Sequence, residues 1–123
     1  MKVLTIEQMN KLKELGVDVK PKGMCLMYTS DSSDNYYLKY GESTCEDDVA
    51  AFGLQGVVEM LPSTIIHNEE SICLNFEYVE KEYGFYYIDY CFNIYVYFHN
   101  TNLLQAAYEM LIWVIATGYL KIK

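Results

Sequence analysis

Residues 71–98 read SICLNFEYVEKEYGFYYIDYCFNIYVYF, and this stretch decides the fold. Apolar side chains alternate with polar ones along residues 71–79, and the alternation resumes after a turn. From Tyr86 to Phe98 every even position is aromatic or aliphatic. A period of two is typical of a strand with one buried face. The stretch therefore predicts an antiparallel hairpin of residues 71–79 with 85–98, whose even positions face the core.

One feature of this hairpin stays open at the level of sequence. Asp89 or Asn93 can mark a bulge or a second turn, so residues 84–98 form either one strand or two. The even-face prediction places Phe76 and Val96 in the core, and it places the odd-numbered side chains on the opposite face.

A long apolar helix follows the hairpin. Residues 102–117 are apolar nearly all round, with Gln105 and Glu109 as the interruptions and Gly118 as the stop signal. A carboxylate near the helix centre makes a membrane span unfavourable. We therefore expect the helix to lie across the sheet. Its other side would be covered by the N-terminal helix, by residues 54–61 or by a second copy of the chain.

Shorter elements precede the hairpin. Thr5 and Gln8 form the capping box of an N-terminal helix that ends at Gly16. Residues 54–61 form a second short helix, which Pro62 stops. Composition predicts a strand, a polar turn and a returning strand between the two helices: residues 24–29, 30–35 and 36–40.

These elements predict an α+β fold in two layers. We expect one antiparallel sheet of about four or five strands, packed by the long C-terminal helix and flanked by the two short helices. The 123 residues fit a single domain, residues 1–123, because no repeat and no linker divides them.

The charge of the chain excludes several classes of partner. Acidic residues number 17 against nine basic ones, all of them lysine, so the formal net charge is -8. An acidic chain without arginine is poorly suited to bind nucleic acid or an anionic membrane. The first residues, MKVLTIEQMNK, hold no long apolar run. We therefore expect a cytoplasmic protein whose partners include neither nucleic acid nor membrane.

The search for chemistry finds no strong motif. The sequence lacks the nucleotide-binding, hydrolase and metalloprotease patterns, and its four cysteines form no CxxC pair. Cys91 and His99 share the odd face, but eight residues of strand separate them by roughly 26 Å, too far for a nucleophile and its base. The sequence therefore predicts no catalytic residue, no cofactor and no metal site. Glu46, Asp47 and Asp48 form a candidate acidic loop, expected to be solvated.

Tyrosine is the most informative residue type. The chain holds 13 tyrosines, and Tyr87, Tyr95 and Tyr97 project with His99 from the predicted odd face. Tyrosine offers a large rigid contact area with a polar tip and is enriched at interfaces. These four residues form the candidate protein-interaction face, unless another part of the same chain covers them.

Three stretches carry a family resemblance. They are TIEQMNKLKELGVD, AFGLQGVVEMLP and LLQAAYEMLIWVIATGYLK, at residues 5–18, 51–62 and 103–121. Together they resemble a group of small proteins of Bacteroides-type gut bacteria and their prophages. The resemblance implies helices that frame an antiparallel sheet and a mobile-element or phage context. It brings no known activity and no catalytic residue.

The leading functional hypothesis is a non-catalytic cytosolic protein-interaction or accessory factor that binds a protein partner or itself, as a homodimer for example. The alternative is a structural protein that works as a homo-oligomeric assembly. An enzyme of unrecognised type is the third hypothesis.

Overall fold

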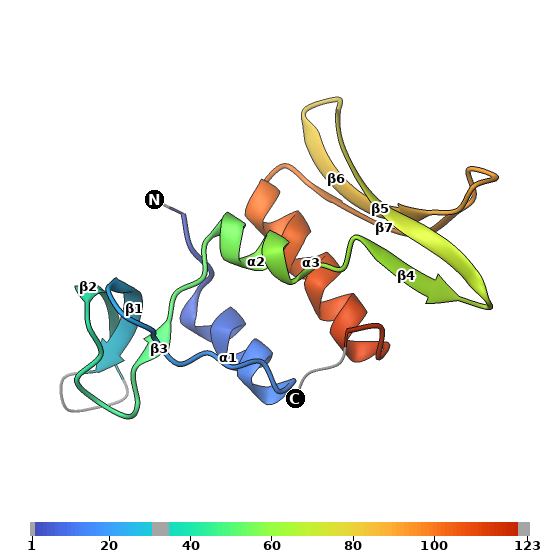
Figure 1. The fold of residues 1–123 in the computed structure, drawn as a ribbon. Helices are drawn as coiled ribbons and strands as arrows, with labels where there is room; N and C mark the ends of the chain where they lie inside the picture. Colours follow the sequence, from blue (N-terminus) through green and yellow to red (C-terminus); the bar gives the residue numbers. More distant parts are fainter. Residues whose placement is uncertain (1, 31–34, 121–123) are drawn as a thin grey trace. The chain divides into compact units, whose positions relative to one another are not determined.

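The computed structural model describes residues 2–30 and 35–120. Within these residues the chain forms three helices and two antiparallel sheets, of three and four strands, which confirms the predicted α+β class (Figure 1). The expected single sheet is thus two sheets. The described residues fall into two compact units, unit 1 (residues 2–53) and unit 2 (residues 54–120). One domain over residues 1–123 stays a prediction, because two compact units can still unfold cooperatively.

Unit 1 contains α1 (Ile6–Glu14), β1 (Cys25–Ser30), β2 (Tyr36–Gly41) and β3 (Val49–Ala50). The capping box of α1 is confirmed: the Thr5 hydroxyl accepts from the Gln8 N–H, and the Gln8 side chain accepts from the Thr5 N–H. Gly16 follows with a φ of 98°, the left-handed conformation expected of a helix stop.

The predicted hairpin of unit 1 is confirmed. β1 pairs with β2 in antiparallel register, with Leu26 opposite Tyr40 and Thr29 opposite Tyr37. The polar turn that joins them was placed at residues 30–35, and its residues 31–34 lie outside the described ranges. β3 pairs with the other side of β1, so β2 lies at an edge of the sheet. The sequence missed β3, because two residues carry no periodicity.

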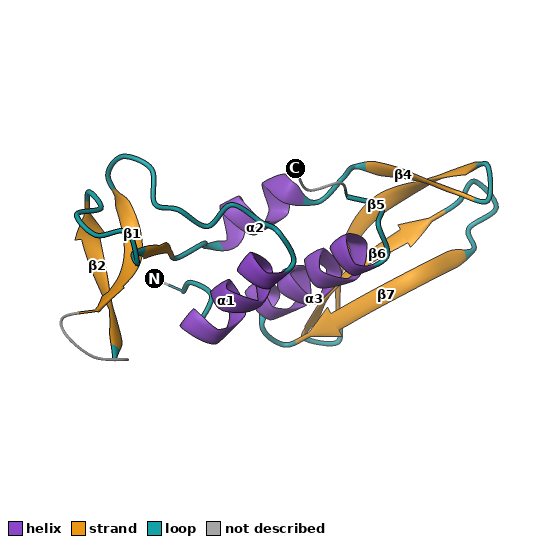
Figure 2. Ribbon diagram, turned by 90° about the horizontal axis from the view of Figure 1, so that it is seen from below, coloured by secondary structure: helices purple, strands orange, loops and turns teal. Residues whose placement is uncertain are grey.

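Unit 2 contains α2 (Leu54–Met60), β4 (Thr64–His67), β5 (Glu70–Val79), β6 (Glu82–Ile88), β7 (Ile94–Asn100) and α3 (Leu103–Ala116). Its four strands are ordered β4-β5-β6-β7, each antiparallel to the next (Figure 2). As expected, α3 packs on the sheet, across β6 and β7, and α2 packs on α3. The short central helix is therefore one of the expected covers of α3.

In β6 the odd-numbered side chains face the core, whereas the sequence predicted that the even-numbered ones would. The turn between β5 and β6 has two residues, Glu80 and Lys81, both with positive φ. A loop of even length pairs even positions with odd ones, so Leu74 lies opposite Tyr87 and Phe76 opposite Phe85. The core side of β5 is even, as predicted, whereas the core side of β6 is odd.

A second turn separates β6 from β7, which answers the question left open for residues 84–98. Residues 89–93 form this turn, and β7 starts at Ile94. Tyr87 pairs with Val96 and Phe85 with Phe98, so these two even positions of β7 return to the core side. The register shifts beside this pair, because Ile88 pairs with Ile94 and leaves Tyr95 as an extra residue, a β-bulge.

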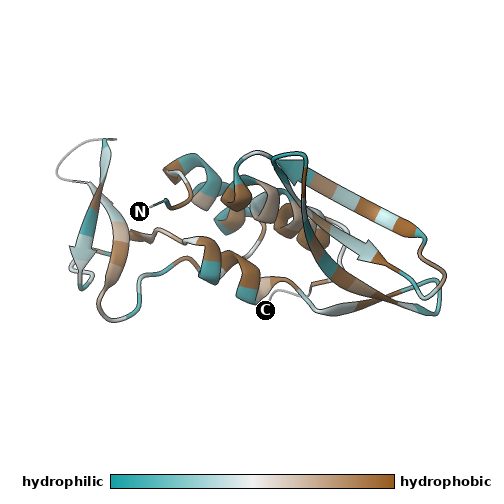
Figure 3. Cartoon of the chain, turned by 90° about the horizontal axis from the view of Figure 1, so that it is seen from above, coloured by the Kyte–Doolittle hydropathy of each residue, from teal (hydrophilic) through white to brown (hydrophobic). Residues whose placement is uncertain are grey.

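The core of unit 2 lies between α3 and the sheet. Phe85 and Tyr87 are buried there, and the Tyr87 hydroxyl donates to the Pro62 carbonyl at 2.7 Å. Phe76 was predicted to be buried but is half exposed, because α3 lies across β6 and β7 instead of the far end of β5. Figure 3 shows how apolar and polar residues follow one another in bands along the strands.

Candidate functional site

Of the four residues predicted to form the interaction face, Tyr95, Tyr97 and His99 are exposed on β7, and the Tyr97 and His99 rings lie 5.3 Å apart. Tyr87 is fully buried, so its assignment to an exposed face is wrong. The physical reason is the parity change at the two-residue turn, which directs the odd positions of β6 toward α3. Burial also raises the pKa of the Tyr87 phenol, as expected for an ionisable group without contact with water.

Tyr95 belongs to a polar cluster at one end of the sheet. Its ring meets His67 edge-on, with 4.9 Å between ring centroids. Its hydroxyl lies 3.3 Å from a carboxylate oxygen of Glu70 and 3.3 Å from one of Asp89. Desolvation and the two acids raise the pKa of Tyr95. His67 in turn bonds to the hydroxyl of Tyr119, the residue that follows Gly118 beyond α3. Tyr95 therefore contacts His67, Glu70 and Asp89, which are not partners of Tyr97.

Tyr97 packs on its own sheet. A Cβ atom added at Gly84 would lie 2.6 Å from a ring carbon of Tyr97, so the ring covers the glycine. A hydrogen bond to Glu77 and desolvation raise the pKa of Tyr97 to about 12. The Tyr86 ring lies 5.7 Å away. Tyr97, at 40% exposure, is therefore partly engaged within the chain.

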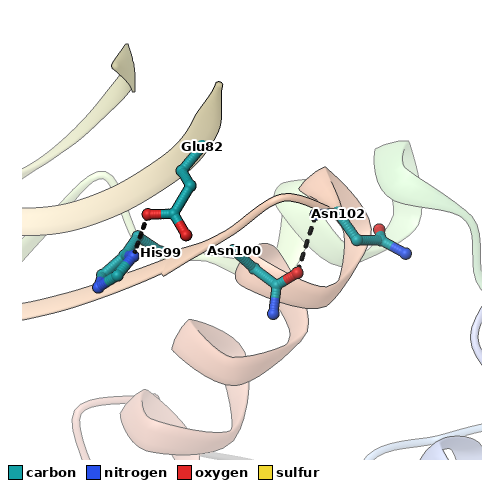
Figure 4. A network of polar contacts seen from close by, with 4 residues as sticks. All are labelled: Glu82, His99, Asn100 and Asn102. Atoms are coloured by element: carbon teal, nitrogen blue, oxygen red, sulfur yellow. Dashed lines mark hydrogen bonds and ion pairs between the residues drawn. The ribbon is translucent and has the colours of Figure 1, made fainter. Parts of the chain in front are cut away.

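His99 is also paired inside the sheet. Its Nδ1 lies 2.7 Å from a carboxylate oxygen of Glu82 on β6 (Figure 4). The side chain of Asn100 next to it accepts from the N–H of Asn102, the residue that caps α3. Cys91 lies in the turn before β7, and the structure does not bring it to His99. A cysteine–histidine nucleophile is not assembled.

The three residues of the candidate acidic loop differ in their exposure to solvent. Glu46 and Asp47 are exposed, as expected of a solvated loop. Asp48 is only 4% exposed, so its assignment to a solvated acidic surface is wrong. The physical reason is a set of hydrogen bonds that the carboxylate accepts from its own loop.

These bonds make Asp48 a structural residue. One carboxylate oxygen, Oδ2, accepts from the Ser43 hydroxyl at 3.0 Å and from the N–H groups of Thr44 and Cys45 at 3.2 and 3.3 Å. The Thr29 side chain and these loop donors hold the pKa of Asp48 below its ordinary value, while the other carboxylate oxygen, Oδ1, is buried without a hydrogen-bond partner among the described residues. Asp48 therefore holds together the loop that leads into β3.

A shallow pocket of about 350 Å³ lies beside this loop, lined by Lys20, Pro21 and residues of the loop. It contains one lysine, one thiol and two carboxylates, but no histidine. Within residues 2–30 and 35–120, no three His, Cys, Asp or Glu side chains lie close enough to hold a metal ion. The pocket offers no recognisable acid–base pair.

The most exposed aromatic side chains lie in residues 89–93, which we call the aromatic turn. Tyr90 is 84% exposed and Phe92 is 83% exposed. Both positions were predicted to face the core, because the even-position pattern runs through the turn without a break. Asp89 and Asn93, which bracket the turn, are the sequence signal that identifies it.

Hydrogen bonds hold the aromatic turn in one shape. Asp89 Oδ1 accepts from the N–H groups of Cys91 and Asn93 at 2.9 and 2.8 Å. The Phe92 N–H donates to the Asp89 carbonyl, and the Asp89 N–H donates to the Asn93 carbonyl. Hydrogen bonding, chiefly from the Asn93 N–H, lowers the pKa of Asp89. The turn is therefore a fixed support for its two exposed rings.

Comparisons with protein-family models, curated proteins and solved structures gave no match. None of the helices in the described ranges has both the length and the hydropathy that a membrane span requires. The function of this chain is therefore inferred from the positions and contacts of its own side chains.

Proposed function

We propose that this chain is a non-catalytic, cytoplasmic protein-interaction or accessory factor and that the aromatic turn is its binding element. The observation that supports the proposal is the exposure of Tyr90 and Phe92, at 84% and 83%, on a turn that Asp89 braces. The even-position aromatics at this point of the sequence are thus available for contact instead of filling the core.

The physics of association favours such a turn. Single exposed apolar side chains are common, but this turn presents two large exposed rings within three residues. Aromatic side chains dominate the binding energy of protein interfaces when they enter a pocket of the partner. Because hydrogen bonds already order the turn, binding loses little additional backbone entropy.

The charges near the turn indicate the chemistry of the partner. Asp89 lies in the turn, and Glu70 lies within hydrogen-bond reach of Tyr95 in the same region. With the net charge of -8, this favours a partner with an apolar pocket and a basic rim. The resemblance of three segments to small proteins of gut bacteria and their prophages supports a mobile-element or phage context for the pair.

The test is crosslinked affinity capture from cells that express the protein, with bound proteins identified by mass spectrometry. The wild type is compared with the double variant Tyr90→Ser/Phe92→Ser. We expect a protein that the wild type enriches and that the variant fails to enrich, with unfolding midpoints that agree because both side chains are exposed.

A matched control removes two exposed apolar side chains elsewhere in unit 2. Ile66→Ser/Tyr78→Ser should retain the partner, since these residues lie outside the aromatic turn. Equal recovery with the wild type and with Tyr90→Ser/Phe92→Ser, or recovery of the bait alone, would contradict the proposal.

A homo-oligomeric structural protein is the second candidate function. The observation that favours it is the exposure of β2 at the edge of the three-stranded sheet, where four large apolar side chains face solvent: Tyr36, Tyr37, Leu38 and Tyr40.

A further inference from the structure

The edge strand β2 combines the unpaired backbone groups of any sheet edge with exposed apolar side chains, which natural edges usually avoid. In the described part of the chain, only β1 bonds to it, so its outer row of N–H and C=O groups has no protein partner. Its side chains are apolar and exposed on both faces, with Lys39 as the one charged residue. An exposed, regular, apolar edge is a template for another strand.

The other sheet edges of the chain are protected. β3 has two residues and β4 has four, too few for a long ladder. β7 has seven residues, but a bulge disturbs its start, and bulges turn an edge away from pairing. β2 has six residues paired with β1 without a register shift. It is therefore the edge best suited to accept a strand.

The distribution of charge selects the occupant. The net charge of -8 opposes contact between two copies of the chain over most of the surface. The strands of the three-stranded sheet are an exception, because β1, β2 and β3 contain no acidic residue. Within the six residues of β2 itself, two copies can thus meet without placing acid against acid.

We infer that β2 pairs antiparallel with β2 of a second copy of this chain, about a two-fold axis at Leu38. The pairing joins two three-stranded sheets into one continuous sheet. It places Leu38 opposite its own copy, Tyr36 opposite Tyr40, and Tyr37 opposite Lys39. An axis at Lys39 would bring two ammonium groups together, whereas the axis at Leu38 brings each ammonium to a tyrosine ring.

This inference deepens the second candidate function and does not depend on the aromatic turn. The first test is the mass in solution by sedimentation equilibrium, from roughly 1 µM to roughly 1 mM protein. We expect a dimer with twice the 14.3 kDa of the chain. Tyr37→Glu/Leu38→Glu should raise the dissociation constant at least tenfold, because it places acids on both faces of the edge.

The matched control places two acids on the edge strand of the other sheet. Thr64→Glu/Ile66→Glu on β4 should retain the dimer, and circular dichroism checks that each variant folds. A wild type that stays monomeric throughout, or a dimer that both double variants weaken equally, would overturn the inference.

The second test locates the axis by disulfide formation in a background of Cys45→Ser and Cys91→Ser, which removes the exposed thiols. Opposite residues of an antiparallel pair have Cα atoms about 4.5–5.5 Å apart, within the range of a disulfide. Leu38→Cys should therefore link two copies upon mild oxidation. Tyr36→Cys alone should not, because its two copies would lie about 14 Å apart. Linking through Tyr36→Cys but not through Leu38→Cys would overturn the assigned axis.

Discussion

Asp48 shows how one carboxylate can hold a loop in place. Its Oδ2 gathers three donors from residues 43–45, all within the loop that Asp48 ends. Bonds to an ionised acceptor are stronger than those between neutral groups. The loop shape therefore depends on the charge of this carboxylate, and the stability of the protein depends on it through pH.

We predict that the free energy of unfolding falls in acid more steeply in the wild type than in Asp48→Asn. The folded pKa of Asp48 lies below its unfolded value near 3.8, chiefly through the Thr29 side chain. The stabilisation is thus complete above the unfolded pKa and is lost as the pH falls through the folded pKa. Urea unfolding from pH 6 downward measures the difference, and parallel curves for the two proteins would refute it.

The matched control is Asp47→Asn, which removes one charge from an exposed neighbour. It should unfold as the wild type does. At pH 7, Asp48→Ala should destabilise the protein by about 1–3 kcal/mol, because the loop donors lose their acceptor.

Gly84 and Tyr97 form the second residue pair with a sharp prediction. Gly84→Ala should destabilise the protein by roughly 1–3 kcal/mol, because the added methyl group enters the space of the Tyr97 ring. The double variant Gly84→Ala/Tyr97→Ala should show a smaller loss than the sum of the two single variants. Gly53→Ala is the control, since its added Cβ would meet nothing closer than 3.7 Å. If the losses of stability in the two single variants simply added up in the double variant, the proposed contact would be contradicted.

At the scale of elements, the β5–β6 turn has a backbone conformation that its two residues do not favour. Glu80 and Lys81 adopt φ angles of 52° and 68°, the region that favours glycine and asparagine. Positive φ at both central residues matches the twist of a two-residue hairpin, so the sheet imposes this conformation on two ordinary side chains. The turn is a place where the sheet overrides local preference.

Lys81→Gly should therefore stabilise the protein by roughly 0.5–1 kcal/mol, the relief of left-handed backbone less the extra entropy of unfolded glycine. Lys81→Ala is the control, because it removes the same side chain and keeps the Cβ atom that causes the strain. Thermal unfolding compares the two variants. A stabilisation by Lys81→Ala equal to that by Lys81→Gly would show that the side chain, and not the backbone, is responsible.

The sequence predicted the elements whose signals are local. Thr5 with Gln8, and the glycines at 16 and 118, mark helix ends through contacts within a few residues. Strand parity is different, because it depends on the number of residues in each turn. Glu80 and Lys81 do not resemble turn residues, so the length of that turn was not visible and β6 was assigned to the wrong face.

Predicting the candidate site also required the lengths of the turns, which the sequence pattern did not show. The parity change buried Tyr87, and the second turn exposed Tyr90 and Phe92, whereas Tyr95 is exposed as predicted. Neither change follows from the order of apolar and polar residues alone. Only Asp89 and Asn93 gave a sequence signal, because both residue types favour turns.

At the scale of the whole molecule, the two compact units raise the question of cooperativity. Unit 1 spans about 50 residues, a size at which a single core is only marginally stable. Its centre contains Met9, which is fully buried. Trp113 is the single tryptophan and belongs to unit 2, so its fluorescence follows that unit alone.

We predict that Met9→Ala lowers the midpoint at which Trp113 fluorescence reports unfolding, by the equivalent of about 2–5 kcal/mol. The reason is that unit 1 should remain folded only as part of one cooperative domain. Circular dichroism of the same samples should give the same midpoint. An unchanged Trp113 transition in Met9→Ala would instead define two domains.

The contact between Gly84 and Tyr97 also has a consequence for how the sequence can evolve. A ring that fills the place of a missing side chain ties the two positions together, so neither is free to drift alone. A line of descent that gains a larger residue at 84 should first, or soon after, exchange Tyr97 for a smaller one. The pair would then leave a record of linked changes in chains that share this sheet.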